Sequence, residues 1–160
     1  MNCHTRKYHG LLVAALDKPA GRYVVLSKFE DSLSIGKEEH FFSCHQYPGL
    51  FFPQAGRCLS SFEYDPAPRF THRIGTMTLR KTIMFLPDEN SVLIRYDLEN
   101  APSGSLLRLK PFLAFRGFHG LAKKNDLLDT KTTNIAKGFT IKPYRYMPPL
   151  FIQTNVDSHF

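Results

Sequence analysis

The chain lacks tryptophan, has few cysteines and contains no long apolar run. Its three cysteines, Cys3, Cys44 and Cys58, cannot all pair with one another, and an odd count argues against a disulfide framework. No segment approaches the roughly 20 apolar residues that a membrane-spanning helix needs. The apolar stretch 11–16 is short and follows Tyr8-His9-Gly10, so it indicates a buried strand rather than the core of a signal peptide. We therefore expect a cytoplasmic protein with no membrane partner.

Basic residues outnumber acidic ones, but they do not cluster. The net charge of +7 and the pI of about 9.4 raise the question of nucleic-acid binding. Lysine and arginine are scattered from Arg6 to Arg145, and the tightest group is the pair Lys123-Lys124. Scattered basic residues are typical of solvated strand faces, which argues against nucleic acid as a partner. A basic nucleic-acid-binding β-domain that stacks bases on its aromatic residues stays an alternative, and salt-dependent retention on single-stranded DNA would support it.

The aromatic content and the local patterns favour strands. The chain has 14 Phe and 7 Tyr, residue types that fit pleated, half-buried surfaces. Residues 22–27 include the β-branched pair Val24-Val25 and follow a turn, so they predict a short strand. Residues 77–86 end at Pro87-Asp88-Glu89-Asn90, a strong turn sequence, and residues 91–98 then alternate apolar and polar side chains. These two runs predict an antiparallel hairpin.

The second half of the chain continues the strand pattern. Residues 106–115 alternate, and Pro111 within them indicates an edge strand or a bulge. Residues 138–142 and 150–154 predict two short strands joined by a turn over 143–149. The best helix candidate, 120–129, lacks a clean apolar stripe. We therefore expect an all-β fold, an antiparallel β-sandwich (supersandwich-like), with residues 1–160 as one domain.

No common catalytic or cofactor motif is present. Cys3-His4, His9 and Cys44-His45 contain zinc-ligand residue types, but adjacent cysteine and histidine do not match the spacing of structural zinc sites, and we expect no metal. A Walker A loop, a dinucleotide fingerprint and a G-x-S-x-G elbow are all absent, so we expect no cofactor. The carboxylate pairs Glu30-Asp31 and Glu38-Glu39 point to opposite faces of a strand, and neither could flank one scissile bond. We interpret both pairs as surface charges near turns and expect no catalytic residue.

Two segments mix basic, aromatic and histidine side chains next to glycine. They are residues 2–10, which include Arg6-Lys7-Tyr8-His9, and residues 115–120, which include Arg116 and His119. Arginine and histidine can donate to sugar hydroxyls while aromatic rings pack against apolar sugar faces. The same residues also suit an ordinary polar interface, and residue chemistry alone leaves both interpretations open.

The stretch 5–16, Thr-Arg-Lys-Tyr-His-Gly-Leu-Leu-Val-Ala-Ala-Leu, closely resembles the N-terminal domain of bacterial and archaeal glycogen-debranching enzymes of the amylo-α-1,6-glucosidase type. The signature of that family carries Asn directly before Thr, whereas Cys3-His4 separates Asn2 from Thr5 here. Further similar motifs follow in the same order over most of residues 5–120. They are Gly21-Arg22, Val25-Leu26-Ser27-Lys28-Phe29-Glu30, Tyr47-Pro48-Gly49, Pro53-Gln54-Ala55-Gly56, Phe62-Glu63-Tyr64-Asp65-Pro66-Ala67-Pro68, and Lys110-Pro111-Phe112-Leu113-Ala114-Phe115-Arg116 with His119.

The resemblance implies a β-sandwich domain ahead of an (α/α)6 barrel, whose carboxylates remove the α-1,6-linked glucose at branch points of glycogen. The barrel lies outside these 160 residues, so we expect the chain to be a non-catalytic part of a larger debranching enzyme. Its partners would then be the C-terminal (α/α)6 catalytic domain and an α-glucan, either glycogen or a branched maltodextrin. The candidates for a substrate-binding or barrel-facing surface are Arg6, Lys7, Tyr8, His9, Arg116 and His119.

One alternative from another class is an autonomous carbohydrate-binding module that needs no barrel. It predicts an exposed aromatic platform, for which Tyr8, Tyr47 and Phe118 are the candidates. Binding of maltodextrins to the isolated chain separates this alternative from a purely structural role.

Overall fold

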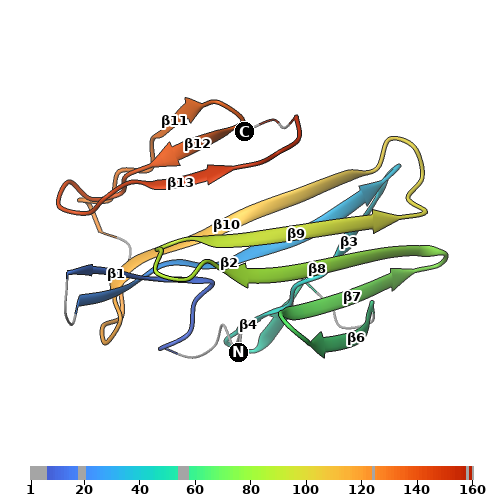
Figure 1. Ribbon diagram of the computed structural model, residues 1–160, viewed down its shortest axis with the longest axis horizontal. Helices are drawn as coiled ribbons and strands as arrows, with labels where there is room; N and C mark the ends of the chain where they lie inside the picture. The colour runs from blue at the N-terminus through green and yellow to red at the C-terminus, as the bar shows by residue number, and fades with distance from the viewer. Residues whose placement is uncertain (1–6, 18–20, 54–57, 124, 158, 160) are drawn as a thin grey trace.

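The chain folds entirely into strands and connecting loops over the residues that the structure describes. In the computed structural model these are residues 7–17, 21–53, 58–123, 125–157 and 159. They contain no helix, and therefore none that is long and apolar enough to cross a membrane. The all-β prediction is confirmed. The strands form two four-stranded sheets, a three-stranded sheet and a small hairpin (Figure 1).

The first four-stranded sheet, called here the β2 sheet, is organised around one long strand. Strand β2 (Gly21–Ile35) pairs on one edge with β10 (Leu106–Gly117), and it also pairs with β1 (Leu12–Asp17) and β3 (Glu38–Phe41). All of these pairings are antiparallel. The predicted strand 22–27 is therefore only the first part of β2. The prediction stopped short because two carboxylates interrupt the apolar pattern in the middle of the strand.

The second four-stranded sheet, called here the β8 sheet, is an antiparallel meander. It contains β6 (Leu59–Tyr64), β7 (Pro68–Ile74), β8 (Met77–Phe85) and β9 (Val92–Glu99), in that order. The predicted hairpin is confirmed as β8–β9, with pairing that runs from Phe85 opposite Val92 to Thr78 opposite Glu99. Asp88 adopts a positive φ of 61° in the turn, a conformation that aspartate tolerates better than most residues.

A buried ion pair joins the two large sheets. Asp31 of β2 is 3% exposed and accepts hydrogen bonds from the Lys81 ammonium of β8 and from the Tyr96 hydroxyl of β9, the latter at 2.9 Å. The turn residue Asn90 adds a second link by exchanging two hydrogen bonds with the backbone of Ala15. The interpretation of Asp31 as a surface charge was wrong. Its charge is stabilised inside the sandwich because distant strands supply a cation and a hydroxyl.

The three-stranded C-terminal sheet packs onto the core of the sandwich. Its strands are β11 (Thr132–Ile135), β12 (Gly138–Ile141) and β13 (Leu150–Gln153), which confirms the two strands predicted in this region. In Figure 1 this sheet lies beside β10. One buried cluster joins it to β1, β2, β8 and β10; its members are Leu11, Leu12, Ala14, Val25, Leu26, Ile83, Phe115, Ile141, Tyr144, Met147 and Leu150.

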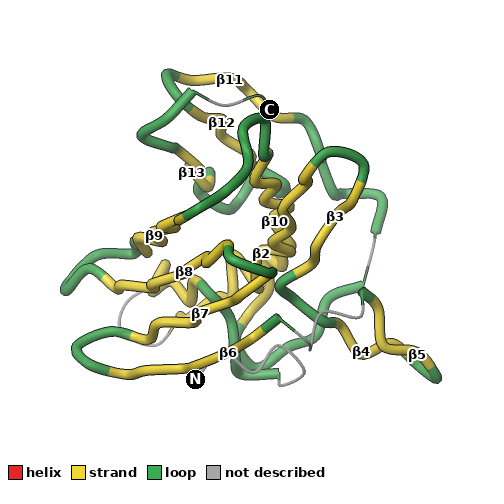
Figure 2. The backbone as a smooth tube through the Cα atoms, turned by 90° about the vertical axis from the view of Figure 1, so that its right-hand side faces the viewer, coloured by secondary structure: helices red, strands yellow, loops and turns green. Residues whose placement is uncertain are grey.

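A small hairpin projects from the body of the molecule. It consists of β4 (His45–Tyr47) and β5 (Leu50–Phe52), which pair antiparallel around Gly49. Figure 2 shows the hairpin at the outer side of the β2 sheet. The side chains of β5 are exposed, so the hairpin is held mainly through β4, where His45 is buried.

Strand β10 ends in an irregular segment, as Pro111 suggested. Within the described part of the chain β10 pairs only with β2, so it is an edge strand, and its register shifts twice between Phe112 and Arg116. Phe115 lies at the second shift with a φ of 41°, a left-handed conformation that is uncommon for a bulky residue. Its ring is nevertheless buried in the core, which holds this strained backbone in place.

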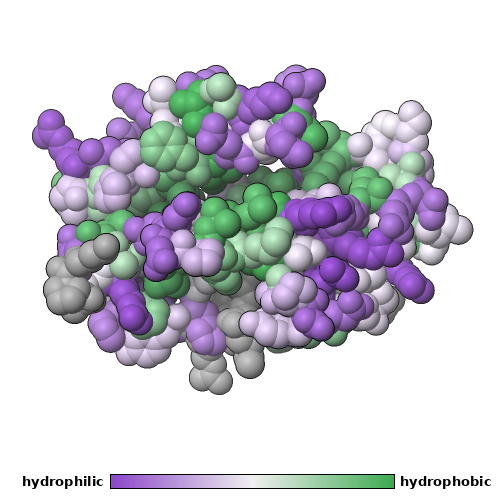
Figure 3. All heavy atoms as spheres, in the orientation of Figure 1, coloured by the Kyte–Doolittle hydropathy of each residue, from purple (hydrophilic) through white to green (hydrophobic). Residues whose placement is uncertain are grey.

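Part of the surface is apolar. In the face shown in Figure 3, apolar side chains gather in the middle of the molecule, over β9 and toward the C-terminal sheet. Leu93 of β9 and Phe151 of β13 are exposed by 52% and 59%. Large exposed side chains of this kind, when contiguous, are typical of surfaces that meet another protein or domain.

Candidate functional site

The two segments singled out in the sequence come together in space. The ring centroid of Tyr8 lies 4.9 Å from that of Phe118 and 5.6 Å from that of His119. The ammonium of Lys7 lies 5.3 Å from the Tyr8 centroid, within the range of a cation–π contact. We call Lys7, Tyr8, Arg116, Phe118 and His119 the Tyr8 cluster. It joins residues separated by more than a hundred positions in the sequence.

Arg116 connects the two segments through hydrogen bonds. Its guanidinium donates through Nη2 to the carbonyl of Lys7 at 2.5 Å and through Nη1 to the carbonyl of Gly120 at 2.9 Å. Both acceptors are neutral, and none of the described carboxylates lies within ion-pair distance of Arg116. The Tyr8 cluster therefore keeps a positive charge next to its aromatic rings.

Local backbone geometry explains why these residues meet. The bulge at Phe115 interrupts the pairing of β10 with β2, which resumes at Arg116 and Gly117, and the Phe118 amide then donates to the Arg22 carbonyl at 2.8 Å. On the other segment, Gly10 lies so close to β2 that a Cβ atom there would come within 2.6 Å of Val24 Cγ1. A glycine at this position lets the segment pack directly against β2.

A cavity of about 420 Å3 opens beside the Tyr8 cluster. Arg116, Gly117 and Gly120 form part of its wall, and Tyr144 and Tyr146 form another part, with ring centroids 5.5 Å apart in a stacked arrangement. Asn125 also lines it and donates to the Tyr144 hydroxyl at 3.1 Å. Aromatic faces with a few hydroxyl and amide groups are the composition expected of a site for a polar, ring-shaped ligand such as a sugar.

The structure brings together most of the predicted site residues. Lys7, Tyr8, Arg116 and His119 are all in the Tyr8 cluster, and His9 is half-buried next to it in the sequence. Arg6 lies outside the described residues. Sequence reasoning missed the side chains of the cavity wall, namely Asn125, Tyr144 and Tyr146, because it interpreted the 143–149 segment only as a turn between strands. The one feature of the sequence that could have indicated this wall was the pair of tyrosines, Tyr144 and Tyr146, two positions apart in that turn.

A second group of polar residues was also missed. Glu30, interpreted as a surface charge, is largely buried and accepts a hydrogen bond from His45 Nε2 at 2.7 Å. His45 Nδ1 in turn lies 2.5 Å from the ammonium of Lys28, beside a cavity of about 530 Å3. The interpretation of Glu30 was wrong because its partner His45 comes from another strand, whereas Glu38 and Glu39 are exposed as expected.

The hydrogen bonds of Arg116 yield a first prediction. Arg116→Met is expected to lower the free energy of unfolding by about 1 kcal/mol and to shift the NMR resonances of the Tyr8 ring, because the bonds to Lys7 and Gly120 are lost. Urea denaturation and NMR spectra measure both effects. Arg73→Met, at an exposed arginine of β7, is the matched control. Equal effects of the two variants, with Tyr8 unshifted, would contradict the fastening role of Arg116.

A family model described as "Glycogen debranching enzyme N terminal" matches residues 1–160, the whole chain. No curated protein and no solved structure was found to match the chain. The chain therefore belongs to the family of glycogen debranching enzyme N-terminal domains.

Proposed function

We propose that the chain is a non-catalytic domain of a glycogen-debranching enzyme, and that the Tyr8 cluster forms part of the surface shared with the catalytic barrel and the α-glucan. The observation that carries the proposal is the convergence of two distant segments on one exposed site. Lys7 and Arg116 supply donors there, and Tyr8 and Phe118 supply ring faces. Sugar hydroxyls accept hydrogen bonds from such donors while the apolar faces of the pyranose ring pack on aromatic rings.

The state of the carboxylates supports a non-catalytic role. Glycoside hydrolysis generally needs two carboxyl groups facing one bond across a gap that holds the substrate. Asp31 is enclosed between the two sheets, and Glu30 is engaged by His45 and Lys110. The two side chains have different partners because they point to opposite faces of β2. Under the proposal, the acid and base belong to the barrel, as the family resemblance implies.

The apolar surface over β9 and β13 supports packing against a further domain. Side chains such as Leu93 and Phe151 gain little from contact with water, and burial against another domain would remove that exposure. Family membership implies a catalytic partner domain, and under the proposal that partner is the barrel.

A titration of the chain with branched maltodextrin tests the glucan part of the proposal. We expect NMR chemical-shift changes at Tyr8, Phe118, His119 and Tyr146, because these residues line the proposed sugar surface. Tyr8→Ala should remove most of these shifts. The control is Tyr64→Ala, at a tyrosine of β6 that is also exposed. A folded sample with no shifts anywhere would leave the domain with a structural role only.

The same residues can be tested in the full-length enzyme that contains this domain. His119→Ala is expected to lower the debranching rate by roughly threefold to tenfold, the loss that one hydrogen bond or ring contact produces. If Tyr8→Ala and His119→Ala leave both the rate and the thermal stability unchanged, the shared surface lies elsewhere.

A second candidate is an autonomous carbohydrate-binding module. The exposed Tyr8 ring, 47% accessible, and the tyrosine-walled cavity beside Arg116 favour it. The two candidates differ in affinity: an autonomous module should bind maltodextrin tightly as an isolated chain, whereas a shared surface should bind it weakly until the barrel is present.

A further inference from the structure

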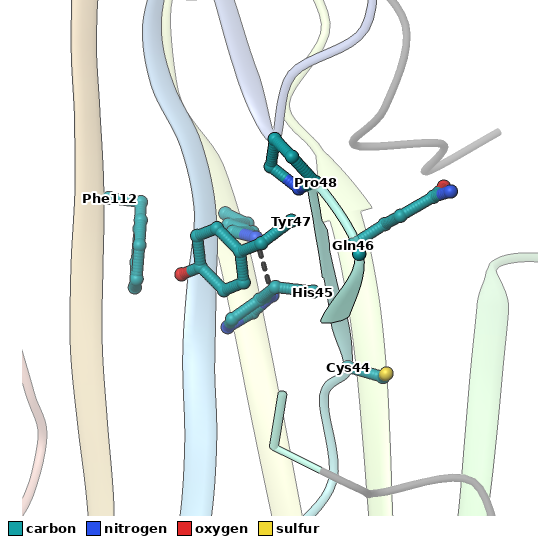
Figure 4. A pocket seen from close by; sticks show the side chains of 8 residues that line it. Cys44, His45, Gln46, Tyr47, Pro48 and Phe112 are labelled. Carbon is teal, nitrogen blue, oxygen red and sulfur yellow. Dashed lines mark hydrogen bonds between the residues drawn. The ribbon is translucent and has the colours of Figure 1, made fainter. Parts of the chain in front are cut away.

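The larger of the two described cavities lies where the β4–β5 hairpin approaches β2 and β10. Lys28, His45, Tyr47 and Phe112 are among the residues that line it, and none of its lining residues belongs to the cavity beside Arg116. In Figure 4 the rings of Tyr47 and Phe112 lie toward β2 and β10, while the side chains of Cys44 and Gln46 point away from them. An inference about this cavity is therefore independent of the proposed function.

A relay of hydrogen bonds fixes Lys28 in the cavity wall. Glu30 accepts from Lys110 at 3.0 Å and from His45 Nε2 at 2.7 Å. Because His45 Nε2 donates to the carboxylate, its Nδ1 is free to accept from the Lys28 ammonium 2.5 Å away. His45 is buried, so the relay holds the ammonium in one position rather than leaving it to sample solvent.

The relay leaves an excess of positive charge at the cavity. Lys28 and Lys110 are both cations, and Glu30 is the carboxylate between them. Glu30 contacts Lys110 directly, whereas none of the described carboxylates lies within ion-pair distance of Lys28. Burial lowers the pKa of Lys28, and the nearby charge of Glu30 offsets this only in part. An anion at this position would supply the missing counter-charge.

The aromatic residues indicate what the anion is attached to. The face of Phe112 is already covered by the Lys28 ammonium, 4.8 Å from the ring centroid. The rings of Tyr47 and His45 are perpendicular with centroids 6.3 Å apart, and Tyr47 keeps 45% of its surface exposed, so it is accessible to a ligand ring. A pyranose ring can pack its apolar face on one exposed aromatic side chain of this kind. The cavity, about 530 Å3, is also much larger than a free phosphate needs.

We propose that this cavity binds a sugar phosphate, with the phosphate paired to Lys28 and the sugar ring packed on Tyr47. Lysine is a point charge that suits phosphate, and its ammonium has donors left after the bond to His45. The site would let the domain sense a phosphorylated sugar at a place separate from the Tyr8 cluster.

Calorimetric and NMR titrations of the chain test the ligand class, with glucose 6-phosphate, glucose, inorganic phosphate and adenosine monophosphate as probes. Glucose 6-phosphate is expected to bind roughly tenfold or more tightly than either glucose or phosphate, because only it engages both halves of the site. Shifts should appear at Lys28, His45 and Tyr47 and not at Tyr8 or Phe118. Equal binding of glucose and glucose 6-phosphate, tighter binding of adenosine monophosphate, or no binding at millimolar concentration would overturn the proposal.

Two variants test the two halves of the site separately, Lys28 for the phosphate and Tyr47 for the sugar ring. Lys28→Met should weaken glucose 6-phosphate binding by roughly tenfold or more, while Lys37→Met, at an exposed lysine in the β2–β3 turn, should leave it unchanged. Tyr47→Ala should weaken glucose 6-phosphate but not inorganic phosphate. Thermal melting verifies that each variant is folded, and if Lys28→Met does not fold, Lys28→Gln and the comparison of probes on the unaltered chain still decide the question. Unchanged binding in a folded Lys28 variant would overturn the assignment.

Discussion

Replacing Asp31 by alanine is expected to lower the free energy of unfolding by about 3–5 kcal/mol. The reason is the position of its partner. The Lys81 ammonium lies between the two large sheets and is almost as buried as Asp31, so without the carboxylate its charge is left in a poorly solvated place. The Tyr96 hydroxyl also loses its acceptor. Urea denaturation monitored by fluorescence or circular dichroism measures the change.

Two controls show whether the buried charge is the cause. Asp97→Ala breaks the ion pair with Arg95, which is exposed, and should cost less than about 1 kcal/mol. The double variant Asp31→Asn with Lys81→Met removes both charges and should be more stable than Asp31→Asn alone, since no uncompensated ammonium remains. If the double variant is no more stable than the single one, the stabilisation comes from packing rather than from the ion pair.

Acidification from pH 6.5 to pH 4 is expected to destabilise the chain through His72, by on the order of 2 kcal/mol. His72 is 6% exposed, packs on Phe42 and has an Nδ1 atom with no hydrogen-bond partner among the described residues. Burial, together with the charge of Lys81, lowers the pKa of His72 from 6.5 to about 4. The unfolded chain therefore binds a proton in this pH window that the folded chain does not, and stability falls as the pH falls.

The variant His72→Phe isolates this effect, because it keeps a ring against Phe42 and removes the titrating group. Its free energy of unfolding should change little between pH 6.5 and pH 4.5. Glu30 and Glu39 contribute little to the slope above about pH 5, because their pKa values lie below the usual 4.5 and the stability that they supply is lost mainly below that pH. For Glu39 the main cause is the hydrogen bond from Ser32. If the free energy of unfolding of His72→Phe falls with pH as steeply as that of the original chain, groups other than His72 dominate the pH dependence.

Local patterns in the sequence predicted the parts of the fold that local interactions determine. The β8–β9 hairpin follows from the turn at 87–90 and the alternation after it, and the edge position of β10 follows from Pro111. The full length of β2 did not follow, because Glu30 and Asp31 resemble a turn when their partners are unknown. Lys81 and Tyr96 lie 50 and 65 residues away from Asp31, and no spacing rule connects residues that far apart.

In the candidate site, too, local sequence predicted the segments but not the contacts between distant residues. Both halves of the Tyr8 cluster were recognisable from their mixture of basic, aromatic and glycine residues, but nothing in the sequence indicated that they touch. The relay from Glu30 to Lys28 was invisible because His45 was judged by its neighbour Cys44 rather than by the strand that it faces. Residue types thus predicted which segments carry chemistry, and tertiary pairing decided which atoms meet.

The hydrogen bond between Arg116 and Lys7 also bears on when Lys7 and Tyr8 can take their final position during folding. Its two residues are 109 positions apart, and synthesis releases Lys7 first. Lys7 and Tyr8 cannot make these contacts until β10 has been made and has paired with β2, a contact between remote parts of the chain that forms slowly compared with a hairpin. During that interval Tyr8 lacks its aromatic neighbours, so Lys7 and Tyr8 are among the last residues of this domain to reach their final position.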